Sequence, residues 1–430
     1  MTADDDAHTL AMVRTFLDRA HLATPGQLSE VVLEAARELG WTALMFVADY
    51  EQEWLIPVPV SGLSEGDPHS IDGTLAGRCF RAVEPVTSLA DGRHTIWLPL
   101  VDGVERLGVL QVVVGQRDDP DDARLQEACR LLGHLAGHLI AAKRPYGDSL
   151  DRLMRRRPRT VASELLHQLL PPLTFACEGL VVSGILQPFY DVAADAFDYS
   201  VVDDAAHIAI LDATGHDLPG TILASIALSA YRNYRRQGLG IFASAHAMDE
   251  LVAEHGEGWR VATGVLGELD LTSGRFRYLN AGHPAPLLMR DGKVVKELTE
   301  GRRVLFGLGE GQGTIAEEWL EPGDRIVLYT DGITEARTAD GEFFGLDRLV
   351  DLLERAATTR QTAPETLRRI SHQVVDHQGG VLRDDATLLI AEWATGEEQR
   401  LTSSWSGGIS AEALSPRSGD REPDGEAPRR

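Results

Sequence analysis

The sequence lacks the features of a secreted or membrane protein. No apolar run approaches the ~18 to 20 residues that a membrane helix needs, and no charged segment followed by an apolar one stands at the N-terminus. The chain has only three cysteines, Cys79, Cys129 and Cys177, and none has the CxxC spacing of a zinc site. We therefore expect a cytoplasmic protein with reduced cysteines, no membrane segment and no zinc site.

Basic residues are scarce relative to acidic ones. The 430 residues include 41 Lys and Arg against 66 Asp and Glu, which gives a net charge of -25. Proteins that bind nucleic acid or anionic lipid use positive charge to displace counterions, so this balance argues against both as partners. A chain of this length is expected to fold into more than one domain.

Residues 1–144 have the pattern of a small α/β module. Helical periodicity is followed by strand-like runs, and in IWLPLVDGVERLGVLQVVVG the pair Asp102-Gly103 predicts a hairpin. An amphipathic helix with apolar residues from Leu125 to Leu139 ends the region. This order of elements, with GTLAGRCFR before the hairpin, resembles a GAF sensor domain. The resemblance implies a small-molecule or protein signal for this module.

Residues 145–178 have the pattern of a connecting helical linker. Its basic residues, which include Arg155, Arg156, Arg157 and Arg159, fit either a patch for an acidic partner or the solvated face of a helix. The segment SELLHQLLPPL then has leucines at helical spacing and a double proline that stops the helix. Such a helix fits an ordinary linker and a homodimer contact equally well.

Residues 179–393 change to short strands separated by turns. Asp203-Asp204 and Asp291-Gly292 predict hairpins. Helices are predicted over three stretches, Thr221–Gln237, Leu346–Ala356 and Pro364–His377. This pattern predicts packed antiparallel sheets covered by helices. Residues 394–430 are rich in Ser, Gly, Pro and mixed charge, and are predicted to form a disordered tail.

Four acidic segments of the C-terminal region stand at or beside predicted strands. They contain Asp195, Asp212, Asp331 and the pair Asp384-Asp385. Carboxylates collected at strand ends supply the oxygen ligands that Mg²⁺ and Mn²⁺ prefer, so the pattern favours a metal-dependent phosphoryl-group enzyme. For Asp385 we expect a turn or cap role beside Asp384 rather than a ligand role.

The C-terminal region resembles the PP2C-like (PPM-type) serine/threonine phosphatases, in the bacterial branch of the sporulation stage II protein E. Six segments carry the resemblance in the family's order: LLHQLLPPL, YDVAADAFDY, LDATGHDLPGTILA, GELDLTSGRFRYLNAGHPAPLL, LEPGDRIVLYTDGITEARTADGEFFG and RDDATLLI. The resemblance implies an α+β protein in which a β-sandwich flanked by helices follows the GAF-like module. It also implies two Mn²⁺ or Mg²⁺ ions in a cleft at one end of the sandwich.

The same resemblance implies roles for individual residues. Asp212 is expected to bridge both ions with help from the backbone carbonyl of Ala213, while Asp331 and Asp384 bind one ion. Asp195 is expected to hold a metal directly or through water. The implied activity, with Asp212, Asp331 and Asp384 as catalytic residues, is hydrolysis of phosphoserine or phosphothreonine on a regulatory protein of the anti-anti-sigma type. The N-terminal module is expected to control it.

The chain departs from the family pattern in two places. Ala193-Ala194 stand where the family has two glycines, and Asp217 stands where it has a glycine after His216. Alanine adds a Cβ that can obstruct close approach to a metal, and Asp217 adds negative charge near the cleft. An alternative function is therefore a catalytically weakened phosphatase scaffold that binds a partner without turnover. His216, which lies close to Asp212, fits a role in holding a metal ligand, and His283 fits a role in shaping a loop.

Overall fold

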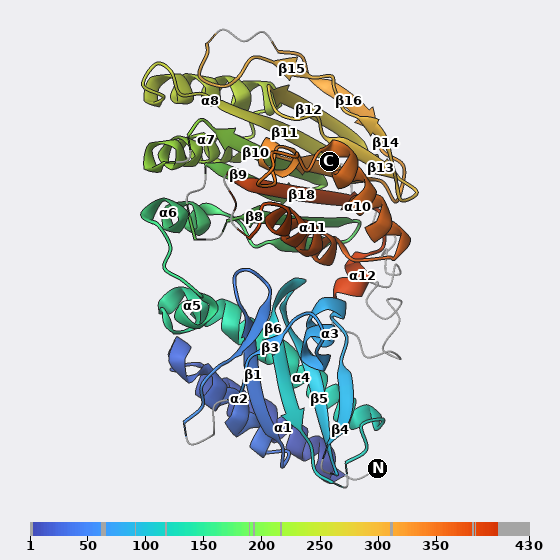
Figure 1. Cartoon of the computed structure of the whole chain (residues 1–430). Coiled ribbons are helices and arrows are strands. Elements are labelled where there is room, and N and C mark those ends of the chain that lie inside the picture. The colour runs from blue at the N-terminus through green and yellow to red at the C-terminus, as the bar shows by residue number, and fades with distance from the viewer. Residues whose placement is uncertain are drawn as a thin grey trace, which may run out of the picture.

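The chain forms two bodies stacked end to end (Figure 1). The structure is a computed structural model that describes residues 3–61, 66–90, 92–116, 118–188, 190–191, 194–215, 217–309, 313–380, 382 and 384–402. The N-terminal domain contains one β-sheet, and the C-terminal domain contains two. No helix within these residues is long and apolar enough to cross a membrane.

The N-terminal domain is built on an antiparallel sheet with the strand order β3-β2-β1-β6-β5-β4. Its strands are β1 (Thr42–Ala48), β2 (Trp54–Pro57), β3 (His69–Ser70), β4 (Val86–Ala90), β5 (Arg93–Asp102) and β6 (Glu105–Val113). Its helices are α1 (Ala3–Ala20), η1 (Pro25–Gln27), α2 (Leu28–Arg37), α3 (Leu75–Ala82) and α4 (Ala123–Lys143). Because side chains alternate along a strand, Met45 of β1 packs with α1, α2 and α4, whereas Phe46 packs with α3 on the other face. The predicted α/β module is confirmed.

Short helices connect the domains: η2 (Arg144–Tyr146), α5 (Ser149–Met154) and α6 (Val161–Leu169). Thr160 caps α6 by accepting a hydrogen bond from the backbone N–H of Ser163 at 3.1 Å. The arginines between α5 and α6 do not form a freely solvated face. Arg155 donates to both oxygens of Glu164 at 2.8 and 2.9 Å, and the guanidinium of Arg159 lies 4.0 Å from the centre of the Tyr50 ring.

The C-terminal domain is a sandwich of two sheets. The first has the order β15-β12-β11-β10-β9, with β16 also paired to β12, and the second has the order β14-β13-β17-β18-β8-β7. The first sheet contains β9 (Asp195–Val202), β10 (Ala205–Ala213), β11 (Ala262–Asp270), β12 (Arg275–Ala281), β15 (Arg302–Arg303) and β16 (Ala316–Trp319). The second contains β7 (Thr174–Cys177), β8 (Leu180–Gln187), β13 (Leu287–Arg290), β14 (Lys293–Glu297), β17 (Arg325–Tyr329) and β18 (Ala386–Trp393).

Helices cover both outer faces of the sandwich. They are α7 (Leu218–Arg236) and α8 (Ile241–His255) on the first sheet, and α10 (Leu346–Thr358) and α11 (Ala363–His377) on the second, with α9 (Asp331–Thr334) near β18. Along β8, Val182 faces the core between the sheets and Val181 faces α10 and α11. The predicted arrangement of sheets flanked by helices is confirmed.

All three predicted hairpins are present. Asp102-Gly103 lies in the turn between β5 and β6, Asp203-Asp204 joins β9 to β10, and Asp291-Gly292 joins β13 to β14. Asp291 and Gly292 both have positive φ, 49° and 74°, as a two-residue turn between twisted strands requires. Local turn chemistry therefore sets these connections.

Three elements differ from the sequence predictions. The second sheet begins at β7, inside the range expected to be linker, and the unpredicted helix α8 packs beside α7. Helix α12 (Glu398–Leu401) lies inside the range expected to be a disordered tail. The reason is burial, because Leu401 is fully buried against the core under α10 and α11. Residues 403–430 of that range lie outside the described residues.

Candidate active site

The four predicted acidic segments meet at one end of the sandwich. Asp195 at the start of β9 is the register partner of Asp212 near the end of β10. In the facing sheet, Asp331 follows β17 and Asp384 precedes β18, and these antiparallel neighbours bring both residues to the same sheet end. Hydrogen bonds join the two sheets there, because Thr330 after β17 and Thr387 in β18 of the second sheet donate to Asp195 of the first.

We call Asp195, Asp212, Asp331, Asp384 and Asp385 the acidic cluster. Burial and the charges of Asp195, Asp331 and Asp384 together raise the pKa of Asp212 to about 9. Burial and the charge of Asp385 raise the pKa of Asp195, and burial and the charge of Asp384 raise that of Asp331. Asp195 and Asp385 are buried, Asp212 is half-buried, and Asp331 and Asp384 are exposed, so the cluster holds like charges close together from the interior to the surface.

The cluster lacks a cationic partner within the described part of the chain. The groups that act on its pKa values are other carboxylates and hydrogen-bond donors, with no lysine or arginine among them. Like charges held close together repel one another, most strongly where they are buried, and a hard divalent cation with oxygen ligands would relieve this repulsion. In charge and donor type the residues therefore fit Mn²⁺ or Mg²⁺. Among the described residues, however, no three acidic, His or Cys side chains are already arranged to hold a metal.

Asp385 has a larger role than the turn or cap predicted for it. The residue is buried, and its Oδ2 accepts a hydrogen bond from the backbone N–H of Ala194. Burial and the charges of Asp384 and Asp212, opposed by the hydrogen bond from the Ala194 N–H, raise the pKa of Asp385 to about 8. Its backbone N–H also donates to Asp384 Oδ1 at 3.0 Å, as a turn partner would. Its carboxyl group nevertheless belongs to the acidic cluster.

Two threonines that were not predicted orient Asp195. The hydroxyls of Thr330 and Thr387 donate to Asp195 Oδ2 at 2.7 and 2.8 Å. Both threonines are fully buried, and the backbone N–H of Thr387 also donates to the Thr330 hydroxyl at 2.9 Å. The available signal was a hydroxyl residue beside each acidic segment, Thr330 before Asp331 and Thr387 after Asp385.

Gly332 is required by close approach. A Cβ at this position would lie 1.7 Å from the backbone oxygen of Asp385. The segments after β17 and before β18 can therefore touch only where a glycine follows Asp331. The Asp331-Gly332 pair brings two parts of the acidic cluster together, which is more than an ordinary turn does.

The backbone at Ala194 and Ala213 links β9 to β10. The N–H of Ala213 donates to the carbonyl of Ala194 at 3.1 Å, and both residues are buried. Ala213, predicted to contribute its carbonyl to a metal, ends β10 directly after Asp212. Ala193 and His216, which the sequence singled out, lie outside the described residues.

His283 is held as part of a turn. Its backbone N–H donates to Asn280 Oδ1 at 2.8 Å, and its Nδ1 lies 2.8 Å from the hydroxyl of Thr263. Burial lowers the pKa of His283 to about 3, so the ring is neutral at physiological pH. These contacts agree with the predicted loop-shaping role.

The sequence suggested that Asp217 adds uncompensated negative charge near the cleft. In the structure this charge has a partner. It is the N-cap of α7, and its Oδ1 accepts from the N–H of Gly220 at 3.0 Å. Arg260 donates to both of its oxygens, at 2.7 and 2.9 Å. Arg260 and the Gly220 N–H lower the pKa of Asp217. The carboxylate is ionised but neutralised by a partner within the chain.

Known proteins are similar to the C-terminal region that contains this site. Residues 203–394 match the family model described as Stage II sporulation protein E (SpoIIE). Protein IcfG of Synechocystis is 24% identical over 271 residues, which cover 56% of this chain and 42% of that protein. Phosphoserine phosphatase RsbU of Bacillus subtilis is 24% identical over 215 residues, which cover 50% of this chain and 63% of that protein. The chain thus spans less than two thirds of the length of both relatives.

Among solved structures, the RsbU and RsbW domains of Rv1364c from Mycobacterium tuberculosis are similar to this chain. The identity is 26% and the TM-score 0.44, with 50% of this chain and 61% of that chain covered. Residues 203–394 are thus similar to the SpoIIE family, and two of the curated relatives, RsbU and RsbP of Bacillus subtilis, are phosphoserine phosphatases.

Proposed function

We propose that the chain is a metal-dependent serine/threonine protein phosphatase that hydrolyses phosphoserine or phosphothreonine on a partner regulatory protein. The observation that carries the proposal is the acidic cluster, which brings carboxylates from four segments to one end of the sandwich with no lysine or arginine partner among the described residues. Phosphoserine is the proposed reacting group because RsbU and RsbP are phosphoserine phosphatases, and the sequence resemblance implies an anti-anti-sigma-type protein as the substrate.

The residues of the acidic cluster have different proposed roles in metal binding. Asp212 would bridge two Mn²⁺ or Mg²⁺ ions with the carbonyl of Ala213, and Asp331, Asp384 and Asp195 would complete their ligands. When bound, the pair of ions would activate a water and neutralise charge on the phosphoryl oxygens. Thr330 and Thr387 orient the Asp195 carboxylate through one oxygen, Oδ2.

The decisive experiment is Mn²⁺-dependent hydrolysis of a phosphoserine peptide by the full chain. We expect turnover by the wild type, and its loss in EDTA and in Asp331→Asn. Equal rates for wild type and Asp331→Asn would contradict the proposal. The alternative, a scaffold that binds without turnover, predicts peptide binding and no hydrolysis. The Arg260 partner of Asp217 removes one of the two sequence arguments for that alternative.

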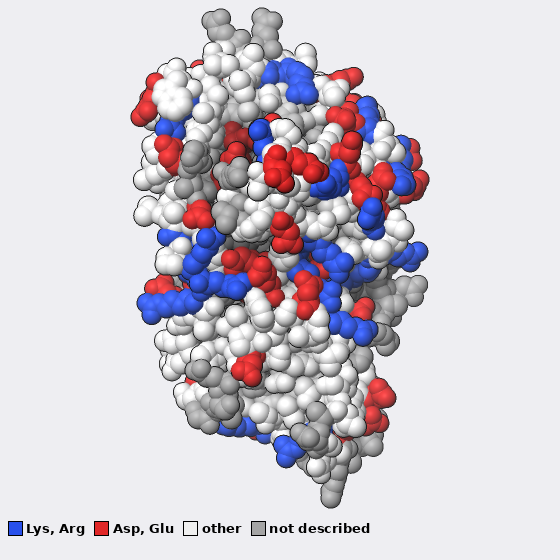
Figure 2. Space-filling model, viewed as in Figure 1, with Lys and Arg blue, Asp and Glu red and all other residues white. Residues whose placement is uncertain are grey.

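We propose that the N-terminal domain is a GAF-like module that controls the phosphatase domain and receives a small-molecule or protein signal. Charged side chains of both signs gather between the two domains (Figure 2). We call Asp72, Glu105, Arg106, Glu365 and Arg368 the domain junction. Its contacts give the N-terminal domain a physical route to the sandwich.

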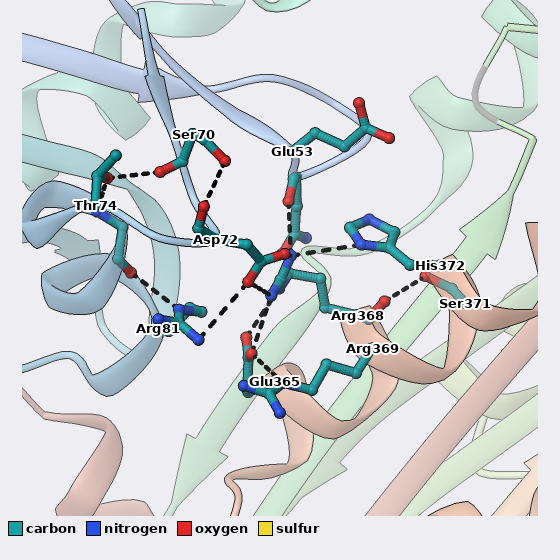
Figure 3. Close-up of polar contacts among 12 residues, drawn as sticks. Glu53, Ser70, Asp72, Thr74, Arg81, Glu365, Arg368, Arg369, Ser371 and His372 are labelled. Atoms are coloured by element: carbon teal, nitrogen blue, oxygen red, sulfur yellow. Dashed lines mark hydrogen bonds and ion pairs between the residues drawn. The ribbon is translucent and has the colours of Figure 1, made fainter. Parts of the chain in front are cut away.

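Arg368 of α11 is the centre of the domain junction (Figure 3). Its side chain is 1% exposed, and its Nη2 donates to Asp72 Oδ1 of the N-terminal domain at 2.8 Å. Its Nη1 donates to the backbone oxygen of Gln52 at 3.1 Å, and its Nε to Glu365 Oε2 at 2.9 Å. One buried guanidinium thus ties two loops of the N-terminal domain to α11.

The hairpin between β5 and β6 of the N-terminal domain contacts the C-terminal domain on the outer face of its second sheet. Val104 at its tip is buried with Val181 and Ile185 of β8 in the core under α11. The neighbouring Glu105 accepts a hydrogen bond from the backbone N–H of Thr174 at 2.6 Å. Since α11 packs on β8 and β18, a movement of this hairpin would reach the strand that follows Asp385.

A second contact leads toward Asp195. The hydroxyl of Tyr190 donates to Glu51 of the N-terminal domain at 3.0 Å and accepts from the backbone N–H of Arg156 at 2.9 Å. Tyr190 is buried and lies five residues before Asp195. Control by the N-terminal domain predicts that Tyr190→Phe, which loses only the hydroxyl, changes kcat in the full chain. An unchanged kcat would argue against this route.

The connecting helix supports the proposal of a homodimer. Val161 of α6 is 74% exposed and Leu165 is 37% exposed, so α6 presents apolar side chains to solvent. Sedimentation of wild type and Val161→Glu would test this. A monomeric wild type would contradict it.

A further inference from the structure

The turn between β10 and α7 is fastened by an ion pair that the sequence did not predict. Arg260 lies between α8 and β11, and its Nη1 and Nη2 donate to Asp217 Oδ1 and Oδ2 at 2.7 and 2.9 Å. Two parallel charge-assisted bonds of this kind fix both the distance and the orientation of the partners. Since Asp217 also caps α7, the arginine is joined to the start of that helix.

Residues 260 and 261 also bind Thr214, on the β10 side of the turn. Thr214 lies two residues after Asp212, and its backbone oxygen accepts from Arg260 Nη1 at 3.3 Å. The backbone N–H and the hydroxyl of Thr214 both donate to the oxygen of Val261, at 2.8 and 2.9 Å. Residues 260 and 261 therefore anchor the chain on both sides of the turn that follows Asp212.

Gly215, which follows Thr214, lies close to the guanidinium. Gly215 has a φ of 102°, and a Cβ there would lie 2.7 Å from Arg260 Nη1. A side chain at this position would be strained and would displace the arginine. On its other side the guanidinium lies 4.5 Å from the centre of the Trp259 ring. The arginine thus fits one place, beside the segment that carries Asp212.

We propose that Arg260 is a positioning residue of the phosphatase site, which cancels the charge of Asp217 and fixes the turn that follows Asp212. The proposal rests on the proposed metal-dependent function. Without Arg260, the charge of Asp217 would oppose a phosphorylated substrate. Without the charge of Asp217, the guanidinium would be free to compete with divalent cations for the acidic cluster. Loss of Arg260 is therefore expected to weaken binding of the phosphorylated substrate, and loss of the Asp217 charge is expected to weaken binding of the divalent cations.

The test compares Arg260→Gln, Asp217→Asn and the double variant in the full chain. KM for a phosphoserine peptide and Mn²⁺ affinity by calorimetry are measured for each. We expect Arg260→Gln to raise KM about threefold without weakening Mn²⁺ binding, and Asp217→Asn to weaken Mn²⁺ binding about threefold without raising KM. The double variant restores the net charge and should return both values toward those of the wild type.

A matched control is Arg290→Gln. Arg290 makes the same two-bond pair with Asp324, at 2.9 and 2.6 Å, but Asp324 precedes β17 whereas Asp331 follows it. An extended chain of this length places the control pair roughly 20 Å from the cluster. We expect Arg290→Gln to lower Tm and to leave KM and Mn²⁺ affinity unchanged.

Some outcomes would overturn the inference. If Arg260→Gln and Asp217→Asn shift KM and Mn²⁺ affinity in the same direction, or if they behave like Arg290→Gln, the pair is only structural. Failure of the proposed function is distinguishable, because a wild type that binds Mn²⁺ without hydrolysing the peptide is not a phosphatase. The calorimetric comparison would still decide whether the pair sets cation affinity.

Discussion

The acidic cluster and the domain junction both gather carboxylates, and they treat them in opposite ways. In the cluster, burial and neighbouring carboxylates raise the pKa of Asp212 to about 9. At the junction, burial would also raise the pKa of Glu365, but Arg368 and Arg106 lower it below its ordinary value. Hydrogen bonds from Arg368 likewise lower the pKa of Asp72 against the effect of burial.

The difference separates a binding site from a structural contact. A carboxylate that has an arginine partner within the chain is stable as it stands, and removing the partner is costly. Carboxylates that lie close together without a basic partner repel one another, and this repulsion destabilises the fold until a cation binds. The same residue type thus serves assembly at the junction and ligand binding in the cluster, and the neighbouring charges decide which.

The largest expected effect is on turnover, and it tests the cluster. Asp212→Asn should lower Mn²⁺-dependent kcat at least about a thousandfold, or about 4 kcal/mol in activation free energy, because it removes the charge that bridges both ions. The Tm of the metal-free protein should stay the same or rise, since one of several repelling charges is gone. Turnover and thermal unfolding in EDTA are the measurements.

The matched control is Asp204→Asn. Asp204 is an exposed turn residue at the opposite end of β10 from Asp212. It should leave kcat and Tm unchanged. A large drop of Tm in metal-free Asp212→Asn would mean that the cluster stabilises the fold, and the contrast with the junction would be lost.

The next effect is on stability, and it tests the junction. Arg368→Met should lower the free energy of unfolding by about 3–5 kcal/mol, because it leaves buried Glu365 without a main partner. Arg369→Met is the control, since that side chain is 42% exposed and makes a single pair with Glu365. It should cost less than about 1 kcal/mol. Urea unfolding measures both, and equal losses would contradict the central place of Arg368.

A smaller effect comes from Glu105, the one carboxylate of the junction that resembles the cluster. Its carboxyl group is enclosed although the residue is partly exposed, and burial raises its pKa from 4.5 to about 7 against the opposing Thr174 N–H. The folded state therefore holds the proton more tightly than the unfolded chain. The stability that this proton contributes is complete below pH 4.5 and is lost as the pH rises to 7.

Glu105→Gln removes that pH dependence while keeping an oxygen for Thr174. Its free energy of unfolding should exceed that of the wild type by up to about 3 kcal/mol at pH 8 and match it near pH 4.5. Urea unfolding at both pH values measures the difference. Glu254→Gln on the exposed surface of α8 is the control and should not change the pH profile of stability. Parallel profiles for wild type and Glu105→Gln would mean that Glu105 is ionised in the fold.

Much of the sandwich could be predicted from the sequence, because local signals specify it. Asp291-Gly292 takes the backbone angles of its turn without help from distant residues. Helix α8 was missed because its buried face includes Ser244, Ala245 and Asp249 in place of large apolar residues. Asp249 is buried because it accepts from the N–H of Gly307 at 2.6 Å, and Gly307 lies 58 residues away.

By itself, the sequence determined which segments carry carboxylates and that they stand at strand ends. Composition and alternation along each strand are local properties, so they can be read without coordinates. Only the tertiary structure decided which carboxylates have partners. Asp217 and Arg260 are 43 residues apart, and Asp72 and Arg368 are 296 apart. Whether an acidic residue is neutralised or left for a cation depends on such distant neighbours, and the fold alone brings them together.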